Sequence, residues 1–285
     1  MKYVVITPVK NEEKYIKETL ESMINQCLRP DEWIIVDDNS TDMTCEIISE
    51  YLVFHQWIKL YKKTTSDNNE RSGGSKIVGI FNWGMCKLKS NEYNIIVKLD
   101  ADLSLPANYF SAIIKKFNSN PKLALCGGYC LIPDSTGNWI REYNNPDHVR
   151  GAFKAYRKEA FMEIGGLKAI WNWDGIDEMM LRYKGYQIET VELPVKHFRP
   201  TSTAYNPYKH SYKSGQEVYR MRYGWLVMAG KALNLMKENP FVLKGACFIG
   251  GFLSSLIKRD KPILNSDLSK FIRQYYCNRI IGKKH

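Results

Sequence analysis

Residues 95–102 read Ile-Ile-Val-Lys-Leu-Asp-Ala-Asp, an apolar run that ends in two carboxylates separated by one residue. The run predicts a strand over 94–99, and similar runs predict strands at 3–7, 32–37 and 57–62. The stretches between these runs have helical spacing of their apolar residues. This alternation is typical of α/β proteins, in which helices connect neighbouring parallel strands. The sequence therefore predicts a Rossmann-like, mostly parallel central sheet flanked by helices.

Further elements are predicted from capping residues and from apolar spacing. Asn11 is expected to be the N-cap of a helix that carries apolar residues from Ile16 to Cys27, and the polar cluster 39–42 is expected to begin a second helix. Residues 63–74 are polar without any period, which predicts a loop of the kind that closes over a ligand. The remaining predictions for this part are helices at 75–88 and 106–118, a strand at 122–130, a loop to about 152, and helices from 156 and from 175.

The composition excludes several classes of protein. With 285 residues, 44% of them hydrophobic and 25% charged, the chain has the make-up of a globular protein of one large or two small domains. Collagen-like, disordered and disulfide-scaffold proteins are thereby excluded. The seven cysteines are scattered and form no Cys-x-x-Cys pair, so they are interpreted as reduced thiols rather than as disulfides or zinc ligands.

Charge divides the chain into two segments. Residues 1–200 carry 26 basic and 26 acidic side chains, whereas residues 201–285 carry 15 basic and 4 acidic ones, so the net charge of +11 belongs to the second segment. A neutral body with a basic, aromatic-rich end predicts that the end contacts something anionic, such as a lipid headgroup layer, a phosphorylated acceptor or nucleic acid. The alternative is a solvated helical face without a partner.

The basic segment is expected to be helical. Tyrosines at 205, 208, 212, 219 and 223 keep a roughly heptad-like spacing, which predicts one long helix. The apolar stretch 241–257 is shorter than the ~20 residues that a membrane span needs, so it is interpreted as a buried helix or as one lying in a membrane surface.

The beginning of the chain bears on its location in the cell. The first apolar run is soon followed by Lys10 and Glu12, and it is too short for the core of a signal peptide. We therefore expect a cytoplasmic protein. Peripheral attachment to the inner face of the cell membrane is compatible with that location.

Acidic residues follow two of the predicted strands. Ligands of open α/β sheets bind beyond the carboxyl ends of the strands, where Asp100 and Asp102 are able to hold Mg²⁺ or Mn²⁺ against a diphosphate. Asp-x-Asp also arises by chance, so its position after a strand carries the argument. Asp37 and Asp38 end another strand, where a carboxylate can accept from a base or a ribose hydroxyl. No Gly-x-Gly-x-x-Gly follows the first strand, which disfavours a dehydrogenase.

These residues resemble glycosyltransferase family 2, whose members are inverting transferases of nucleotide-diphosphate sugars with the GT-A fold. The stretch Thr-Pro-Val-Lys-Asn-Glu-Glu at 7–13 looks like the opening nucleotide loop of that family, and 36–42 resembles its second motif. Leu-Asp-Ala-Asp at 99–102 is similar to its metal and donor motif. The resemblance implies donor contacts from Thr7, Pro8, Val9, Glu12, Asp38, Asp100, Ala101 and Asp102.

Two further elements extend the resemblance. Lys76, with Asn82 and Gly84, is similar to a family element beside the diphosphate, and Arg71 or Lys76 is expected to assist the leaving group. His197 resembles the metal-binding histidine that follows the last core strand of the family. The resemblance thus implies a divalent metal, Mg²⁺ or Mn²⁺, held by Asp102, Asp100 and His197.

The acceptor side of the resemblance begins with Gly151, which looks like the start of the loop before the acceptor helix. The acidic run 174–178 is placed like the family motif that supplies the catalytic base. The resemblance implies Asp177 as the base, and Asp174 and Glu178 remain rivals. Gly151, Trp171 and Trp173 are expected at the acceptor, with core packing as the alternative for the two tryptophans.

Together these patterns predict two domains and one activity. Residues 1–200 are expected to form the GT-A nucleotide-sugar-binding and catalytic domain, and residues 201–285 a helical, basic extension that contacts acceptor or membrane. The predicted enzyme is a metal-dependent hexosyltransferase of polysaccharide or cell-envelope synthesis that moves a sugar, with UDP as the expected nucleotide, to a glycan or lipid-linked acceptor. Nucleic acid is not expected as a partner. The alternatives are a sugar nucleotidyltransferase, or a membrane- or nucleic-acid-binding module with an inactive transferase-like body.

Overall fold

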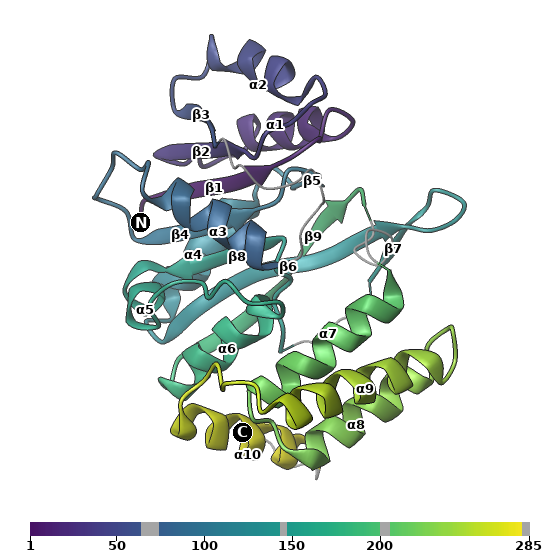
Figure 1. Cartoon of the computed structure of the whole chain (residues 1–285). Helices are drawn as coiled ribbons and strands as arrows, with labels where there is room; N and C mark the ends of the chain where they lie inside the picture. The colour runs from purple at the N-terminus through teal and green to yellow at the C-terminus, as the bar shows by residue number, and fades with distance from the viewer. Residues whose placement is uncertain (64–73, 143–146, 200–205, 281–285) are drawn as a thin grey trace. The chain divides into compact units, whose positions relative to one another are not determined.

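The computed structural model describes residues 1–63, 74–142, 147–199 and 206–280. The chain divides into two compact units, Met1–Pro200 and Thr201–His285, and each is considered by itself (Figure 1). The predicted loop 63–74 falls almost wholly outside the described residues. The division coincides with the shift in charge near residue 200, so the neutral and the basic segments are separate structural units.

The N-terminal unit is built on a central sheet. Its described strands follow the order β3-β2-β1-β4-β8-β6-β9-β5, and β7 pairs with β6 outside this path. The strands are β1 (Tyr3–Val9), β2 (Glu32–Asp37), β3 (Ile58–Lys62), β4 (Ile95–Leu99), β5 (Leu103–Ser104), β6 (Leu123–Pro133), β7 (Trp139–Arg141), β8 (Phe153–Arg157) and β9 (Gln187–His197).

Parallel pairing is confined to two regions of this sheet. The strands β3, β2, β1 and β4 run parallel, as predicted, and so do β6 and β9. Strand β8 runs antiparallel to both β4 and β6. The expected α/β fold class is confirmed, but the half of the sheet beyond β4 is mixed.

Strand β8 was not expected, because the sequence predicted a loop to about 152 and then a helix from 156. The structure has a strand over Phe153–Arg157, and the helix begins only at Lys158. A charged residue, Lys154, stands in the middle of the strand and is fully buried. It interrupts the apolar pattern that identifies a buried strand, and only its ion pairs in the folded protein make that position acceptable.

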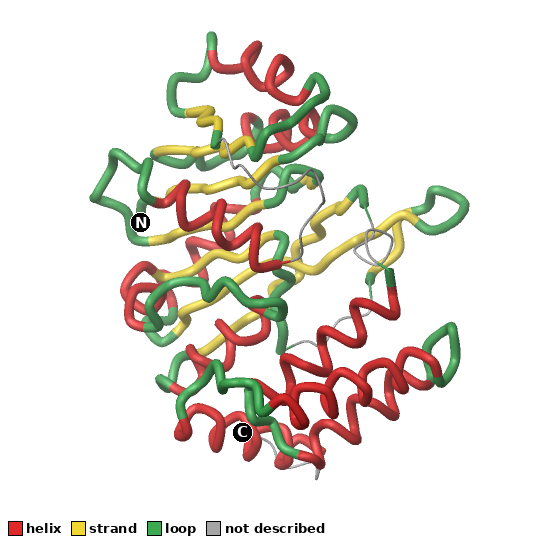
Figure 2. Tube along the Cα trace, in the orientation of Figure 1, coloured by secondary structure: helices red, strands yellow, loops and turns green. Residues whose placement is uncertain are grey.

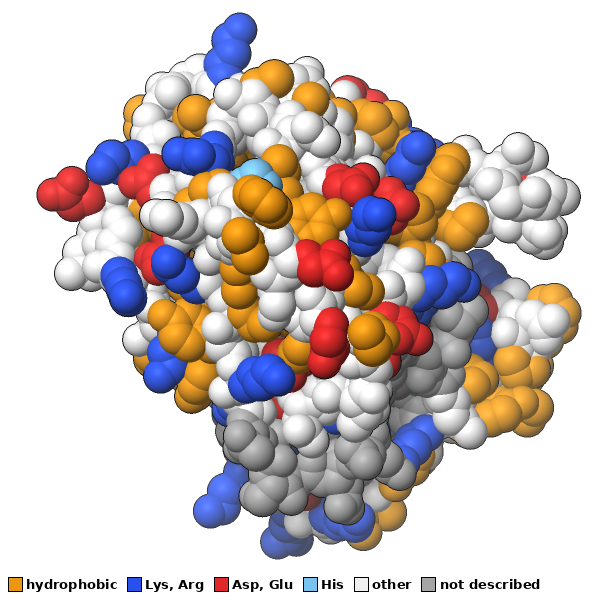
Figure 3. Space-filling view, turned by 90° about the horizontal axis from the view of Figure 1, so that it is seen from above, with side chains coloured by type: hydrophobic (Ala, Val, Ile, Leu, Met, Phe, Trp, Pro, Cys, Tyr) orange, Lys and Arg blue, Asp and Glu red, His pale blue; other side chains and the backbone are white. Residues whose placement is uncertain are grey.

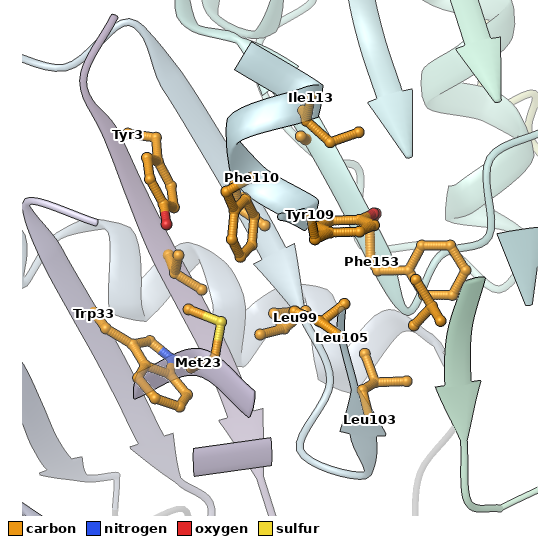
Figure 4. Close-up of a cluster of buried hydrophobic side chains, with 14 of the residues drawn as sticks. Tyr3, Met23, Trp33, Leu99, Leu103, Leu105, Tyr109, Phe110, Ile113 and Phe153 are labelled. Atoms are coloured by element: carbon orange, nitrogen blue, oxygen red, sulfur yellow. The ribbon is translucent and has the colours of Figure 1, made fainter. Parts of the chain in front are cut away.

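Helices cover both faces of the sheet (Figures 1 and 2). The side chains of β1 alternate between two cores, with Tyr3 and Val5 in one and Val4 and Ile6 in the other. Figure 4 shows the first core, where the Tyr3 ring stacks on Phe110 with centroids 4.6 Å apart. The first core lies beneath α1 (Ile16–Ile24), α2 (Thr44–Leu52) and α4 (Tyr109–Ser119), and the second beneath α3 (Gly74–Met85), α5 (Lys158–Glu163) and α6 (Trp173–Tyr183).

The loops after β1 and β2 bind each other, and this corrects one predicted cap. Helix α1 begins at Ile16 without a side-chain cap, so Asn11 is not its N-cap. Asn11 has a φ of 52°, a conformation that asparagine tolerates better than most residues. Its side-chain oxygen accepts from the Thr41 amide at 2.8 Å, and its own amide donates to Ser40 Oγ at 2.9 Å. Asn11, which was predicted to cap a helix, instead holds two loops together at one edge of the sheet, whereas α2 does begin after the cluster 39–42, at Thr44.

Charge is mixed over the molecular surface seen from above. Figure 3 shows acidic and basic side chains interspersed with apolar ones, and neither sign of charge covers that face as a whole. This distribution gives no broad anionic or cationic field on the face shown. Specific contacts must therefore define a site there.

The C-terminal unit consists of helices in its described part. They are α7 (Pro207–Arg220), α8 (Trp225–Met236), α9 (Leu243–Lys258) and α10 (Ser266–Ile280). The predicted single tyrosine helix is wrong at its end, because α7 stops at Arg220 and Tyr223 is buried in the turn before α8. Within residues 206–280, as in the other described ranges, no helix has the length and apolar character needed to cross a bilayer.

Helices α7 and α9 pack with their backbones in close contact. A Cβ atom added at Gly251 would lie 1.9 Å from the Tyr212 carbonyl oxygen, and one added at Gly215 would lie 1.9 Å from the Phe248 carbonyl oxygen. Any larger side chain at either position must push the two helices apart. The two glycines thus determine how closely the helices approach.

Candidate active site

Five of the ten predicted donor residues lie beyond the carboxyl ends of β1, β2 and β4, namely Glu12, Asp38, Asp100, Ala101 and Asp102. These strands are parallel neighbours, so the segments that follow them meet at one edge of the sheet. Lys10 follows β1, Asp38 follows β2, and Asp100 follows β4. The topology therefore gathers residues from three distant stretches of sequence into one region.

Asp38 is the most deeply buried acid among the predicted donor contacts. It is buried, its carboxylate lies 2.7 Å from Lys76 Nζ, and Lys10 Nζ is 3.9 Å from the same oxygen. The first turn of α3 positions Lys76, whereas Lys10 comes from the loop after β1. Two predicted donor residues, Asp38 and Lys76, thus form one ion pair at the sheet edge.

The residues of the first loop differ in what they can offer a ligand. Thr7 is fully buried, and its hydroxyl accepts from the Trp33 indole nitrogen at 2.9 Å, so its side chain serves the sheet. Val9 is buried as well, and Pro8 is half-buried. Glu12 is half-buried and pairs with Arg199, which links this loop to the end of β9.

A second charged group surrounds Asp102. Strands β5 and β9 pair with Leu103 opposite His197, and the Phe198 amide donates to the Asp102 carbonyl at 3.0 Å. This pairing brings His197 Nε2 to 3.4 Å and Arg199 Nε to 3.7 Å from the two oxygens of the Asp102 carboxylate. Residues almost one hundred positions apart in the sequence therefore meet because a two-residue strand pairs with β9.

Electrostatics favour the charged forms of this pair. Burial disfavours ionised Asp102, yet the hydrogen bond and charge of His197, with Arg199, lower the pKa of Asp102 below its usual value. Burial also acts against protonated His197, but the Asp102 carboxylate prevails and raises the pKa of His197 to about 10. Without a ligand, the pair is thus an imidazolium beside a carboxylate.

Asp100 is arranged differently from Asp102. Its carboxylate pairs with Lys98 Nζ, two residues earlier in β4, and its amide donates to the Ala152 carbonyl at 2.8 Å. Burial raises the pKa of Asp100, the Lys98 charge acts in the opposite direction, and the neighbouring Asp102 raises it further. Ala101, between the two acids, is buried.

The predicted metal ligands fit a divalent cation only in part. Within the described ranges, no group of three or more His, Cys, Asp or Glu side chains is arranged to hold a metal ion. Asp102 and His197 are nevertheless separated by 3.4 Å, a spacing that two ligands of one cation can adopt. Mg²⁺ commonly takes one or two protein ligands and completes its shell with water and substrate phosphates. Asp102 and His197 therefore fit such a site, whereas Asp100 is held by Lys98.

A third group of charges lies at the start of α6 and contains a fully buried lysine. Lys154 Nζ is 2.8 Å from Asp177 and 3.1 Å from Glu178, and all three residues are buried. Asp177 also accepts from the Tyr156 hydroxyl at 2.5 Å and from the Glu178 amide at 2.7 Å. His148 Nδ1 lies 3.0 Å from Glu178. Asp177, the predicted base, thus has protein partners on both carboxylate oxygens.

The protonation of these acids differs because their neighbours differ. Burial raises the pKa of Asp177 to about 6, although the Lys154 ammonium acts against that rise. Burial also disfavours ionised Glu178, but Lys154 and His148 outweigh it and lower the pKa of Glu178. Lys154 stays protonated, because the surrounding carboxylates overcome the effect of burial and raise its pKa.

Asp174 is the more accessible acid of this region. It is half-buried in the first turn of α6, and its backbone carbonyl accepts from Lys154. A Cβ atom built on Gly151 would lie 3.1 Å from Asp174 Oδ2, so the absence of a side chain at Gly151 leaves room for this carboxylate. Gly151 and Asp174, two predicted acceptor-side residues, are therefore neighbours.

Trp173 is buried between lysines. Lys98 and Lys154 are directly opposite each other on β4 and β8, and their ammonium groups lie 5.3 Å and 5.6 Å from the Trp173 ring centroid. Trp173 is only 6% exposed, which favours the core-packing alternative over stacking on an acceptor sugar. Trp171 is half-buried, and its role stays a prediction.

Two predicted donor elements are not brought into this region. The side-chain amide of Asn82 donates to the Leu167 carbonyl at 3.3 Å, and Gly84 packs against Ile6 and Val36 in the core. Arg71 lies outside the described residues. Asn82 does not lie beside Lys76, because residues six positions apart on a helix lie on different faces.

Sequence reasoning missed Lys98, Lys154 and Arg199. The two lysines stand inside otherwise apolar strands, and a charge at such a position requires a buried partner. Arg199 lies two residues after His197, which places it on the same side of an extended segment. Both signals were present in the sequence, but the partners became identifiable only in the fold.

Comparison with known proteins identifies the family of the chain. Residues 4–171 match the family model of glycosyl transferase family 2, so the chain belongs to this family of glycosyltransferases. An uncharacterized glycosyltransferase of Mycoplasma genitalium is 25% identical over 187 residues, which cover 58% of this chain and 56% of that protein. The chain spans about half the length of the curated relatives it matches.

Solved structures share the fold. TarS 1–349 of S. aureus, in complex with UDP-GlcNAc, matches with a TM-score of 0.56 at 17% identity. The match covers 90% of this chain and 73% of that chain. A mannosyltransferase from Pyrobaculum calidifontis, in complex with GDP-Man and Mn²⁺, has a TM-score of 0.56 at 16% identity, and the match covers 98% of this chain and 80% of that one. The fold is therefore that of the GT-A glycosyltransferases, as the sequence predicted.

Proposed function

We propose that this chain catalyses inverting transfer of a sugar from a nucleotide-diphosphate sugar to a hydroxyl group of a glycan or lipid-linked acceptor. One observation carries the proposal. The Asp100 amide donates to the Ala152 carbonyl at 2.8 Å, and a Cβ atom built on the adjoining Gly151 would lie 3.1 Å from Asp174 Oδ2. The segment 151–152 therefore lies next to both the metal and donor motif and the acid in the first turn of α6.

The donor end is assigned to the carboxyl ends of β1, β2 and β4. Asp38 is proposed to accept from the nucleotide base, with Lys76 and Lys10 fixing its carboxylate. Glu12 is proposed to contact the ribose, and Arg199 holds its carboxylate in the ligand-free protein. UDP is the expected nucleotide, a choice that the UDP-GlcNAc complex of TarS supports by analogy of fold only.

Departure of the nucleoside diphosphate requires neutralisation of its developing negative charge. Asp102 and His197 are the side chains that would hold Mg²⁺ or Mn²⁺, and a divalent ion bound there supplies Lewis acidity to the leaving diphosphate. The chain adds positive charge of its own, because Arg199 lies 3.7 Å from Asp102 and Lys98 pairs with Asp100. His197 must lose its proton when it binds a metal, so metal affinity is expected to rise with pH.

The general base must reach an acceptor hydroxyl while ionised. The sequence prediction names Asp177, whose raised pKa suits a base, but its buried carboxylate accepts four hydrogen bonds from three donor groups. Asp174 is half-buried, and Gly151 leaves space beside its carboxylate. We therefore favour Asp174 for direct proton removal and assign Asp177 to fixing Lys154. Asp177 stays the second candidate, and Glu178, which is buried and paired, the third.

The test is release of nucleoside diphosphate from a panel of nucleotide sugars, with and without Mg²⁺ or Mn²⁺. Wild-type protein is compared with Asp102→Asn, Asp174→Asn and Asp177→Asn. Each variant is first checked for folding by its thermal transition, and Asp134→Asn on the exposed β6–β7 turn is the control. We expect Asp102→Asn to lower release and its metal dependence, and Asp174→Asn to lower transfer at least ~100-fold.

The same experiment can contradict each assignment separately. Full transfer by Asp174→Asn with loss only in Asp177→Asn would return the role of base to Asp177. Unchanged metal dependence in Asp102→Asn would remove the proposed metal ligand. Donor binding without turnover by any form would indicate a missing acceptor, whereas no binding of any nucleotide would contradict the transferase proposal itself.

A further inference from the structure

The C-terminal unit exposes an unusual amount of apolar side chain. We call this set the apolar surface: Trp225, Leu226, Leu233, Phe241, Val242, Leu243, Leu253, Leu256 and Ile257, each between 36% and 81% exposed. All nine lie on α8, on α9 or on the segment that joins them. Single exposed apolar residues need no explanation, but nine of them on two consecutive helices and their connecting segment point to a partner.

Helix α8 has apolar side chains on both its buried and its exposed sides. Val227, Met228 and Ala232 point into the unit. The exposed residues within the helix are Trp225, Leu226, Ala229, Leu233 and Asn234, of which only the last is polar. A helix that faces water normally presents charged or polar residues on its outer side. The outer side of α8 instead presents apolar residues at spacings of three, four and seven.

Helix α9 repeats this pattern. Phe248, Gly251, Phe252 and Ser255 are buried. The exposed residues are Leu243, Ala246, Leu253, Leu256, Ile257 and Lys258, and the single charge comes at the last position of the helix. The connecting segment adds Phe241, which is 67% exposed. The exposed sides of α8 and α9 and their connection therefore share one apolar character.

Positive charge borders this surface. Residues 206–280 contain 13 basic and 4 acidic side chains. Lys237 is exposed at the end of α8, and Lys258, Arg259 and Lys261 are exposed at the end of α9. Apolar helix faces with basic residues at their ends are the features by which helices bind in the plane of an anionic membrane.

We propose that α8, α9 and their connecting segment dock this protein on the surface of an anionic lipid bilayer, with the apolar surface in the headgroup region and the lysines on the headgroups. The charge selects this occupant. A second copy of the chain would place the same basic residues against one another, whereas anionic headgroups complement them. The helices lie on the membrane rather than across it, since none described is long and apolar enough to span.

The test is co-sedimentation of the full chain with vesicles of phosphatidylcholine alone and of phosphatidylcholine mixed with phosphatidylglycerol. The double variant Leu233→Glu, Ile257→Glu changes two exposed positions, one on α8 and one on α9. The matched control is Val53→Glu, Phe54→Glu at the end of α2, where the two side chains are 73% and 81% exposed. A second variant, Lys258→Gln with Lys261→Gln, removes charge without touching the apolar surface.

We expect binding to the anionic vesicles to exceed binding to the neutral ones at least ~10-fold. The Leu233, Ile257 variant should lose this binding, the Lys258, Lys261 variant should weaken it and its salt dependence, and the α2 control should retain it. Failure to bind either vesicle, or equal loss in the α2 control, would overturn the proposal. A dimer that dissociates only in the Leu233, Ile257 variant, without vesicle binding, would assign the surface to self-association instead.

This proposal does not depend on the proposed transferase activity. Vesicle binding requires no nucleotide, metal or acceptor, and none of the substituted residues belongs to the candidate active site. A protein that binds vesicles but no nucleotide would contradict the enzyme proposal alone, and an active protein that does not bind vesicles would contradict the membrane proposal alone.

Discussion

Replacing Lys154 by methionine tests the central ion network of the N-terminal unit. Methionine keeps most of the length and apolar stem of lysine, so the change removes mainly the charge. Lys154 is 0% exposed and is 2.8 Å from Asp177 and 3.1 Å from Glu178. Removing one partner leaves two buried carboxylates without their shared cation, which costs about 3–5 kcal/mol of stability in comparable pairs.

The cost should depend on pH. Burial already raises the pKa of Asp177 to about 6, and Lys154 is the strongest influence that opposes this rise. Without Lys154 the pKa of Asp177 must rise further, so the folded variant takes up a proton at a higher pH than the folded wild type does. Proton uptake relieves the buried charge, and the loss of stability should therefore be smaller at about pH 6 than at about pH 8.

Urea denaturation of the whole chain at these two pH values measures the effect. Lys184→Met is the control, because Lys184 pairs with Glu163 at 3.2 Å on the surface and both side chains are more than 40% exposed. That variant should change stability little at either pH. A loss below about 1 kcal/mol for Lys154→Met, or an equal loss at both pH values, would refute the reasoning.

Three other predictions follow from particular contacts. In wild type, the raised pKa of Asp177 stabilises the folded state at low pH, and this contribution is lost as pH rises from about 4 to about 6. The stability of wild type relative to Asp177→Asn, measured by urea denaturation, should therefore fall over that range. A rise over the same range would mean that Lys154 outweighs burial in setting the pKa of Asp177. Gly251→Ala should lower the free energy of unfolding by about 1–3 kcal/mol or more, because its Cβ would lie 1.9 Å from the Tyr212 carbonyl oxygen. The control in the same urea denaturation is Gly230→Ala in α8, which has open space around it and should not destabilise the chain. Gly151→Ala should lower sugar transfer by crowding Asp174, and full activity would argue against Asp174 as the base. The added Cβ would also lie 3.1 Å from Trp173 Cζ2, so transfer is compared at a temperature below the thermal transition of the variant.

Local sequence patterns were sufficient where neighbouring residues carry the information. The strand at 32–37 and the parallel direction of the first four strands followed from apolar runs that alternate with helical spacing. The Asp-x-Asp pair was placed correctly after β4 because an apolar strand determines where its polar end emerges. The family was identified from short motifs because each contains several residues in a fixed order.

Tertiary structure decided everything that depends on long-range pairing. Strand β8 was hidden by Lys154, whose presence in a core is explained only by Asp177 and Glu178 more than twenty residues away. The pairing of β5 with β9 brings His197 and Arg199 to Asp102. The family resemblance implied His197 beside Asp102, whereas the position of Arg199 became identifiable only from this pairing. Asn11 looked like a helix cap, but its side chain found Thr41 in the neighbouring loop.

The same distinction holds for the base and for the basic end of the chain. Sequence determined that three acids lie within residues 174–178 and that the positive charge is concentrated beyond residue 200. Only the fold decided that Asp177 is buried against a lysine while Asp174 is half-buried, and that α8 and α9 turn apolar residues outward. The physical reason is that burial and ion pairing are properties of the space around a side chain, and segments distant in sequence fill that space.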